Sequence, residues 1–210
     1  MKKTMEHSMY DWQQHLVDGP VVGVDEVGRG CLAGRVYACA AELNLDADWE
    51  MYTDSKVLSE KKREAYAKHI VDNHRYSIAY ASVEEIHKYN ILNASLLAMH
   101  RAVMGLKLDS ATVLIDGNKT IPNLDVAYQQ ITLVKGDLRA QPIAAAAIVA
   151  KVQRDRYIAK LGEKYPGYGF ELHKAYATKA HKAAIEELGP TEEHRRDFKG
   201  VKEHWAQLQL

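Results

Sequence analysis

The sequence predicts an α/β protein with a mixed sheet and a helical C-terminal part. Three short apolar segments come early in the chain, two more follow a helical stretch, and only helices are expected after them. The chain has 210 residues, of which 47% are hydrophobic, and no apolar run approaches the roughly 18 residues that a membrane span needs. These observations exclude a disordered chain and a membrane-spanning protein.

Five strands are expected from short apolar runs bounded by turn-forming or polar residues. In chain order they cover residues 21–24, 35–43, 76–81, 112–115 and 131–134. Between the third and fourth strands, residues 91–105 are rich in Leu, Ala and Met and predict a largely buried helix.

Three further helices have recognisable ends. Ser59 is a suitable N-cap for a helix that runs to about His74. Pro142 fits the first turn of a helix that runs to about Leu161. Thr178 can cap a helix that stops at the Gly-Pro pair 189–190.

Charge is balanced overall but unevenly distributed. The chain has 28 basic and 28 acidic side chains, yet residues 151–210 carry 12 Lys/Arg against 9 Asp/Glu. Such clusters are typical either of a solvated helical surface or of a face that binds nucleic acid. The two cysteines, Cys31 and Cys39, are too few for a disulfide framework, and the polar N-terminus does not resemble a signal peptide, which favours a cytoplasmic protein.

Acidic residues follow three of the expected strands. Asp25 and Glu26 come directly after the first, Asp116 ends the fourth, and Asp137 follows the fifth. Side chains alternate between the two faces of a regular strand, so Asp25 and Glu26 converge only if the pleat breaks there, and nearby glycines would allow such a break. Since ligand sites in α/β sheets often lie at strand ends, we expect these four carboxylates to gather in one site.

Four crowded carboxylates repel one another unless cations neutralise them. Their oxygen ligands favour hard divalent ions, Mg²⁺ or Mn²⁺. Two such ions can activate a water and stabilise a leaving oxygen in phosphodiester hydrolysis. A competing interpretation is that each acid caps a turn.

Residues 28–33, GRGCLA, also match a dinucleotide-binding pattern, G-x-G-x-x-A. That pattern requires a helix immediately afterwards. Residues 34–40 instead read as a strand, so dinucleotide binding is disfavoured. The chain also lacks a G-x-x-x-x-G-K-[ST] phosphate loop.

Seven ordered segments between about residues 20 and 200 resemble bacterial ribonuclease HII. They are GVDEVGRG at 23–30, DSK with LSEK at 54–61, IDGN at 115–118, VKGD at 134–137, AKVQRD at 150–155, HKAYATKAH at 173–181, and GPT with HRR at 189–196. The resemblance implies a ribonuclease H-like fold, with a mixed five-stranded sheet flanked by helices. It places a catalytic core at residues 1–160 and a helical, substrate-binding subdomain at 161–210.

The same resemblance implies cleavage of the RNA strand of RNA–DNA hybrids. It also implies incision 5′ to single ribonucleotides embedded in duplex DNA, leaving 3′-hydroxyl and 5′-phosphate ends. Asp25, Glu26, Asp116 and Asp137 would hold two Mn²⁺ or Mg²⁺ ions in a monomeric enzyme.

Three substrate contacts are carried over from the resemblance. Backbone groups of Gly28, Arg29 and Gly30 would read the ribose 2′-hydroxyl, the group that distinguishes RNA from DNA. Tyr176 would stack on the next sugar, and Lys56 would face the nucleic-acid backbone.

This sequence departs from the family pattern at several positions. Cys31 replaces a proline, Leu138 a serine, and Ala144 and Ala147 further serines, while Ala175 and Ala177 flank Tyr176 where glycine or a turn residue is usual. Ala175 disfavours a positive φ, which would displace Tyr176 if that angle is needed. Two alternatives follow: a related nuclease that cuts DNA strands or junctions, and a hybrid-binding protein with impaired catalysis. Ribonuclease HIII, with its extra N-terminal domain, is disfavoured.

Overall fold

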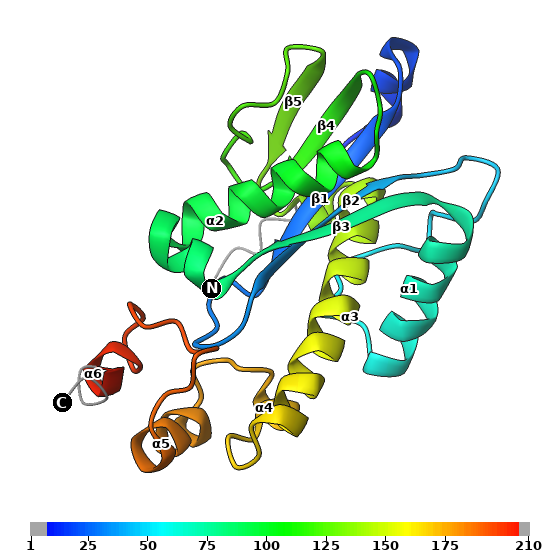
Figure 1. Cartoon of the computed structure of the whole chain (residues 1–210). Coiled ribbons are helices and arrows are strands. Elements are labelled where there is room, and N and C mark those ends of the chain that lie inside the picture. Colours follow the sequence, from blue (N-terminus) through cyan, green and yellow to red (C-terminus); the bar gives the residue numbers. More distant parts are fainter. Residues whose placement is uncertain (1–7, 206–210) are drawn as a thin grey trace, which may run out of the picture.

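A mixed five-stranded sheet forms the centre of the computed structural model, which describes residues 8–205 (Figure 1). The strand order is β3-β2-β1-β4-β5. The strands are β1 (Val21–Val27), β2 (Val36–Glu42), β3 (Arg75–Ala81), β4 (Ala111–Asp116) and β5 (Tyr128–Leu133). β2 runs antiparallel to β1 and β3, whereas β4 runs parallel to β1 and β5. The predicted mixed sheet is therefore confirmed.

Helices cover both faces of this sheet. α2 (Val83–Gly105) packs on one face, and α1 (Glu60–Asn73) and α3 (Gln141–Lys164) pack on the other (Figure 1). The shorter elements are η1 (Gln13–Asp18), η2 (Gly136–Leu138), α4 (Phe170–His173), α5 (Lys179–Leu188) and α6 (Lys202–Trp205). Among residues 8–205, no helix is long and apolar enough to cross a membrane.

The expected helix caps at Ser59 and Thr178 are confirmed. Each side-chain oxygen accepts a hydrogen bond from the backbone N–H three residues later. The buried helix expected at residues 91–105 is confirmed, but the helical turns before it were not predicted; a capping box formed by Ser82 and Glu85 begins α2 at Val83. A kink at Asn90, with φ of 64°, separates that first part from the buried helix that was expected.

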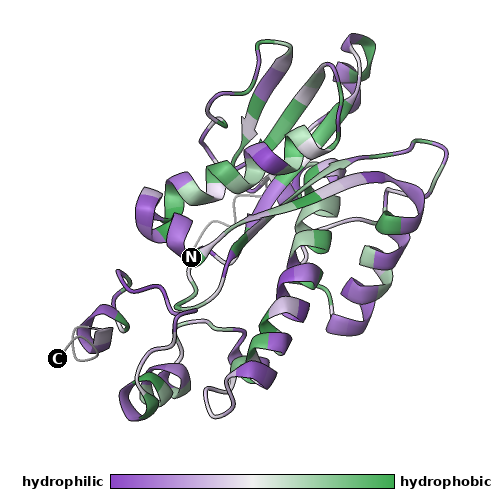
Figure 2. Cartoon of the chain, viewed as in Figure 1, coloured by the Kyte–Doolittle hydropathy of each residue, from purple (hydrophilic) through white to green (hydrophobic). Residues whose placement is uncertain are grey.

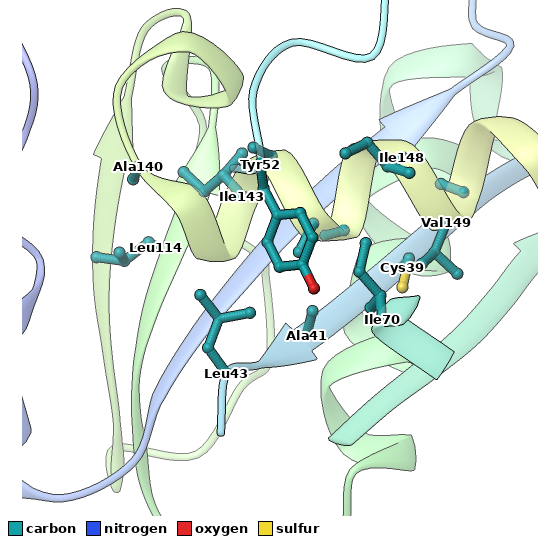
Figure 3. Packing of buried hydrophobic residues seen from close by; sticks show 14 of the residues in the cluster. Cys39, Ala41, Leu43, Tyr52, Ile70, Leu114, Ala140, Ile143, Ile148 and Val149 are labelled. Carbon is teal, nitrogen blue, oxygen red and sulfur yellow. The ribbon is translucent and has the colours of Figure 1, made fainter. Parts of the chain in front are cut away.

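Two hydrophobic layers enclose the sheet, and its central strands are largely hydrophobic (Figure 2). Figure 3 shows the layer under α3, where Tyr52, from the loop before α1, lies with Leu43 of the β2 end and Ile143 of α3. The Tyr52 hydroxyl hydrogen-bonds His69 Nδ1 and His74 Nε2 at 2.6 and 2.7 Å, so its polar end is satisfied inside the protein.

Gly23 allows α3 to approach β1 closely. A Cβ added at Gly23 would lie 2.0 Å from the backbone carbon of Pro142 and 2.2 Å from the nitrogen of Ile143. No side chain fits at that distance, so the first turn of α3 touches the backbone of β1. This contact brings the turn before α3, which carries Asp137, to the end of β1.

A third hydrophobic cluster joins the loop after β1 to the C-terminal helices. Leu32 and Ala33 pack there with Ile158 of α3, Phe170 of α4 and Ile185 of α5. The C-terminal helices lie beyond one end of the sheet (Figure 1). The domain boundary expected between residues 160 and 161 falls inside α3.

Candidate active site

Asp25 and Glu26 belong to β1 itself. They pair with Cys39 and Ala38 of β2, and the ladder continues in regular register to Val27. The expected break of the pleat between the two acids is therefore wrong, because pairing with β2 keeps both residues extended. Asp25 is buried, and its Oδ1 accepts a hydrogen bond of 2.7 Å from the N–H of Glu26.

The other two acids lie at neighbouring strand ends. Asp116 is the last residue of β4, and Asp137 lies in η2 directly after β5. Asp116 Oδ1 accepts the N–H of Gly136 at 2.7 Å, which ties the turn that carries Asp137 to the end of β4. Lys135 turns the chain there with a left-handed backbone, at φ of 57°.

The four acids share one electrostatic environment. Burial raises the pKa of Asp25 well above its ordinary value, and the charges of Glu26, Asp116 and Asp137 raise it further. Burial raises the pKa of Glu26 to about 7, with Asp116 adding to the effect and Arg29 opposing it. Burial and then Asp137 raise the pKa of Asp116. The charges of the other three acids thus act on Asp25, and that of Asp116 acts on Glu26, although Asp25 and Glu26 are consecutive residues of a regular strand.

This donor set fits a hard divalent cation. The available ligands are carboxylate oxygens, and a bound cation would offset the burial and repulsion that raise the pKa values of Asp25, Glu26 and Asp116. Within residues 8–205, no group of three or more His, Cys, Asp or Glu side chains is already arranged to hold a metal ion. In this arrangement the ammonium of Lys56 supplies positive charge, with its Nζ 3.1 Å from Asp137 Oδ2 and 3.9 Å from Asp54 Oδ1.

Lys56 therefore lies beside the acids, with a side chain that remains 77% exposed. Partial burial disfavours its charge, but the hydrogen bond to Asp137 outweighs that effect and raises the pKa of Lys56 above its ordinary value. An exposed ammonium next to the carboxylates is free to turn toward a phosphate.

The Gly28-Arg29-Gly30 segment forms the turn that leaves β1. Gly28 has φ of 98°, and a Cβ there would lie 2.3 Å from Nε of the buried Arg154, so only glycine fits. Arg29 is half-exposed, and its Nη1 lies 3.4 Å from Glu26 Oε1. Gly30 has open space around it, so a ligand can approach the backbone closely.

Tyr176 lies beside this turn although it is far away in sequence. It forms an isolated antiparallel bridge with Cys31, and the N–H of Leu32 donates to the carbonyl of Ala175 at 2.9 Å. Its ring is 40% exposed, and the Arg154 guanidinium lies 5.7 Å from the ring centroid. The glycine-rich turn and the tyrosine thus face the same edge of the sheet as the acids.

The replacement of glycine by Ala175 does not prevent the turn. Ala175 adopts φ of 63°, and its methyl group is fully buried in the third hydrophobic cluster. The left-handed conformation costs an alanine about 1–2 kcal/mol, which packing of the methyl group offsets by about 0.8 kcal/mol. The expectation that Ala175 does not adopt a positive φ is therefore wrong.

Sequence reasoning missed several buried polar residues behind the site. Arg154 and Arg195 are fully buried, and so are His181 and His194. His181 and His194 lie within the basic C-terminal part, residues 151–210, for which the sequence predicts a solvated or nucleic-acid-binding surface, yet the structure buries both side chains. The only sequence signal for these four residues is that basic residues and histidines recur between residues 151 and 210. Such residues are mostly exposed in proteins, so this signal does not predict burial. Asp155, at the end of the AKVQRD segment, pairs with Lys151 one turn earlier on α3 at 2.7 Å.

Comparison with known proteins agrees with this architecture. The family model described as Ribonuclease HII matches residues 22–208. A ribonuclease HII from Pelagibacter ubique is 46% identical over 181 residues, which cover 86% of this chain and 96% of the relative. Among solved structures, ribonuclease H2 from Pyrococcus horikoshii OT3 matches with a TM-score of 0.72 and 22% identity, over 90% of this chain and 99% of that one.

A second structural match is Bst-RNase HIII in complex with Mn²⁺. It gives a TM-score of 0.66 at 18% identity, over 90% of this chain and 70% of that one. At these identities both structures support the fold alone, whereas the family model and the curated relative cover nearly the whole chain. The chain therefore belongs to the ribonuclease HII family of endonucleases, which cleave the RNA strand of RNA–DNA hybrids and cut at ribonucleotides embedded in DNA.

Proposed function

We propose that Asp25, Glu26, Asp116 and Asp137 hold two divalent cations, Mn²⁺ or Mg²⁺, for phosphodiester hydrolysis. The observation that carries this proposal is the raised carboxyl pKa of Asp25, Glu26 and Asp116, to which burial contributes most and to which the charge of Asp137 adds at Asp25 and Asp116. A structural relative binds Mn²⁺. When bound, such ions lower the pKa of a water and neutralise charge on the leaving oxygen.

The chain's own residues orient the substrate. Backbone groups of Gly28, Arg29 and Gly30 read the 2′-hydroxyl of the ribonucleotide, since the turn is open at Gly30 and no side chain fills it. Tyr176 stacks on the sugar that follows, and its exposed ring is suited to that contact. Cleavage occurs 5′ to the ribonucleotide and leaves 3′-hydroxyl and 5′-phosphate ends.

Charge supports a nucleic-acid partner. The formal net charge of zero includes the four site carboxylates. Two divalent cations would bring the loaded protein to about +4, and binding to a phosphate backbone would weaken as the salt concentration rises. Lys56 contributes one of the phosphate contacts from the edge of the site.

A cleavage assay with matched duplexes tests the proposal. The substrate is a DNA duplex with one ribonucleotide, supplied with Mg²⁺ or Mn²⁺ beside an all-DNA control. We expect cleavage of the first duplex only, and loss of activity in Asp25→Asn. Equal cleavage of both duplexes would favour a DNA nuclease, and binding without cleavage in either metal would favour a hybrid-binding protein.

The stacking role has its own control. Tyr176→Ala is expected to lower cleavage at the embedded ribonucleotide by about tenfold, if its contact with the sugar is worth about as much as the 1–3 kcal/mol of an aromatic ring stacked on a base. Tyr89 on α2 is equally exposed, so Tyr89→Ala makes the same chemical change away from the site. If both variants retain full activity, Tyr176 does not contact the substrate.

A further inference from the structure

Residues 191–195 are attached by backbone contacts to residues 32–34, which directly follow the glycine-rich turn at residues 28–30. The N–H of Gly34 donates to the carbonyl of Glu193 at 2.8 Å, and the N–H of Arg195 donates to the carbonyl of Leu32 at 2.8 Å. His194 also forms an isolated bridge with Ala33. This C-terminal segment therefore has a fixed place relative to the turn.

Arg195 holds the turn from inside the protein. Its side chain is 1% exposed, and it donates from Nε to the carbonyl of Gly34 at 2.9 Å, from Nη1 to Arg29 at 2.9 Å and from Nη2 to Arg35 at 3.3 Å. A buried guanidinium is costly unless its donors are used. Here three nitrogens bind three backbone carbonyls of one loop, and one of these belongs to Arg29 of the proposed ribose-reading segment.

A chain of hydrogen bonds runs from the same segment to Tyr176, and its direction follows from fixed donors and acceptors. The backbone N–H of Thr191 donates to His194 Nδ1 at 2.9 Å, so that nitrogen is an acceptor and the hydrogen of His194 is on Nε2. His194 Nε2 lies 3.1 Å from His181 Nε2, which must accept. The hydrogen of His181 is then on Nδ1, which donates to the carbonyl of Tyr176 at 3.0 Å.

Both imidazoles are neutral in this arrangement. His181 and His194 are fully buried, and the ring of His173 stacks on His181 with centroids 4.4 Å apart. A second hydrogen on His181 Nε2 would face the N–H of His194 Nε2, and a second hydrogen on His194 Nδ1 would face the backbone N–H of Thr191, so either would place two donors against each other. These hydrogen bonds therefore have one stable arrangement of donors and acceptors, in which His181 holds the backbone carbonyl of Tyr176.

We infer that Arg195, His194 and His181 are positioning residues, which together set the distance between the glycine-rich turn and Tyr176. Arg195 holds the carbonyl of Arg29, its neighbour His194 binds His181, and His181 holds the carbonyl of Tyr176. The inference rests on the proposed function, because it supposes that the turn and Tyr176 read the same ribonucleotide. A misplacement of about 1 Å can lower a rate by about a hundredfold, so this spacing matters for catalysis.

Arg195→Lys tests the inference without removing the buried charge. A lysine has a single side-chain nitrogen and reaches only one of the three carbonyls, so the loop loses two of its three hydrogen bonds to this side chain. We expect kcat on the single-ribonucleotide duplex to fall by about tenfold to a hundredfold, with little change in KM and no change in Mn²⁺ affinity measured by calorimetry. Arg101→Lys is the matched control, because Arg101 on α2 also donates to a carbonyl, that of Tyr80.

A double-mutant cycle shows whether Arg195 acts through Tyr176. If it does, Arg195→Lys costs much less in a Tyr176→Ala background than in the native protein. Independent, additive losses would overturn the inference. If Tyr176→Ala alone has no effect, the proposed function of Tyr176 fails first, so the two failures are distinguishable.

The histidines provide a second test if Arg195→Lys fails to fold. His181→Asn keeps a donor near the position of Nδ1, whereas His181→Leu fills the space without one. We expect the asparagine variant to retain at least about tenfold more activity than the leucine variant. Nitrogen NMR of the native protein should show His181 with hydrogen on Nδ1 and His194 with hydrogen on Nε2. The opposite tautomers, or equal activities of the two variants, would refute the proposed role of the hydrogen bonds that link His194, His181 and Tyr176.

Discussion

Replacing Glu26 by glutamine is expected to stabilise the metal-free protein at alkaline pH while it abolishes cleavage. Glu26 is mostly buried, with 15% of its side chain exposed, and it shares the site with other carboxylates. In the absence of a cation, its negative charge opposes folding. Glutamine keeps the shape of the side chain and removes that charge.

The magnitude follows from the pKa of Glu26, which burial raises from 4.5 to about 7. A raised carboxyl pKa means that its contribution to stability is complete below about pH 4.5 and is lost as the pH rises to about 7. The difference of about 2.5 pKa units corresponds to about 3 kcal/mol. Loss of the contact with half-exposed Arg29 costs under about 1 kcal/mol, so a net gain of about 2–3 kcal/mol remains above pH 8.

Urea unfolding in EDTA at pH 5 and pH 8.5 measures this effect. The variant should be more stable than the native protein at pH 8.5 and similar to it at pH 5. Comparing the two proteins at both pH values cancels the titration of groups that do not interact with Glu26. The charge of Glu26 also raises the pKa of Asp25, so its removal stabilises the folded state at high pH in the same direction. Glu186→Gln, on the exposed side of α5, should show no such difference.

Addition of Mn²⁺ completes the experiment. A bound cation stabilises the folded state according to its affinity, so the native protein should gain more than Glu26→Gln. The reasoning would be refuted if Glu26→Gln were no more stable than the native protein at pH 8.5 in EDTA. Full cleavage activity in the variant would refute the assignment of Glu26 to the metal site.

Three further predictions concern packing, charge and acid sensitivity. Gly23→Ala should destabilise the protein by about 3 kcal/mol in urea unfolding, because its Cβ would meet backbone atoms of Pro142 that cannot move aside; an unchanged midpoint would contradict this. Lys56→Gln should reduce the slope of log Kd against log salt for a hybrid by about 1, and an unchanged slope would mean that Lys56 binds no phosphate. Burial lowers the pKa of His181 to about 4, so stability should be lost as the pH falls from about 6.5 toward 4. The stability difference between native protein and His181→Phe should therefore shrink by about 2 kcal/mol from pH 7 to pH 5, and a constant difference would contradict the neutral imidazole.

All five strands could be predicted from the sequence because each is a short run of apolar residues between turn residues. Boundaries were less accurate, since β5 starts at Tyr128 among glutamines that only pairing with β4 makes part of the sheet. The start of α2 was missed because its first turns are polar, and the capping box of Ser82 and Glu85 begins it. Short elements such as α4 and α6 carry too few residues to show a periodicity.

The four acids of the candidate site were predictable for a different reason. Each lies at a strand end, next to or near a glycine, and the ends of β1, β4 and β5 meet because these strands are parallel. The backbone structure that positions these acids was not predictable. β1 stays regular through Asp25 and Glu26, and the hydrogen bond between Gly136 and Asp116 joins the turn that carries Asp137 to β4.

The sequence by itself determined the sheet, the helices that cover it and the acids at its edge, because local apolar patterns and strand-end chemistry specify these features. Only the tertiary structure decided the environment of Tyr176 and the roles of Arg195 and His181. These residues lie about 150 positions from the turn at Arg29, and nothing local marks a buried arginine or a neutral histidine pair. Burial becomes visible only when distant segments pack together, and burial is what turns these polar side chains from surface charges into fixed hydrogen-bond partners.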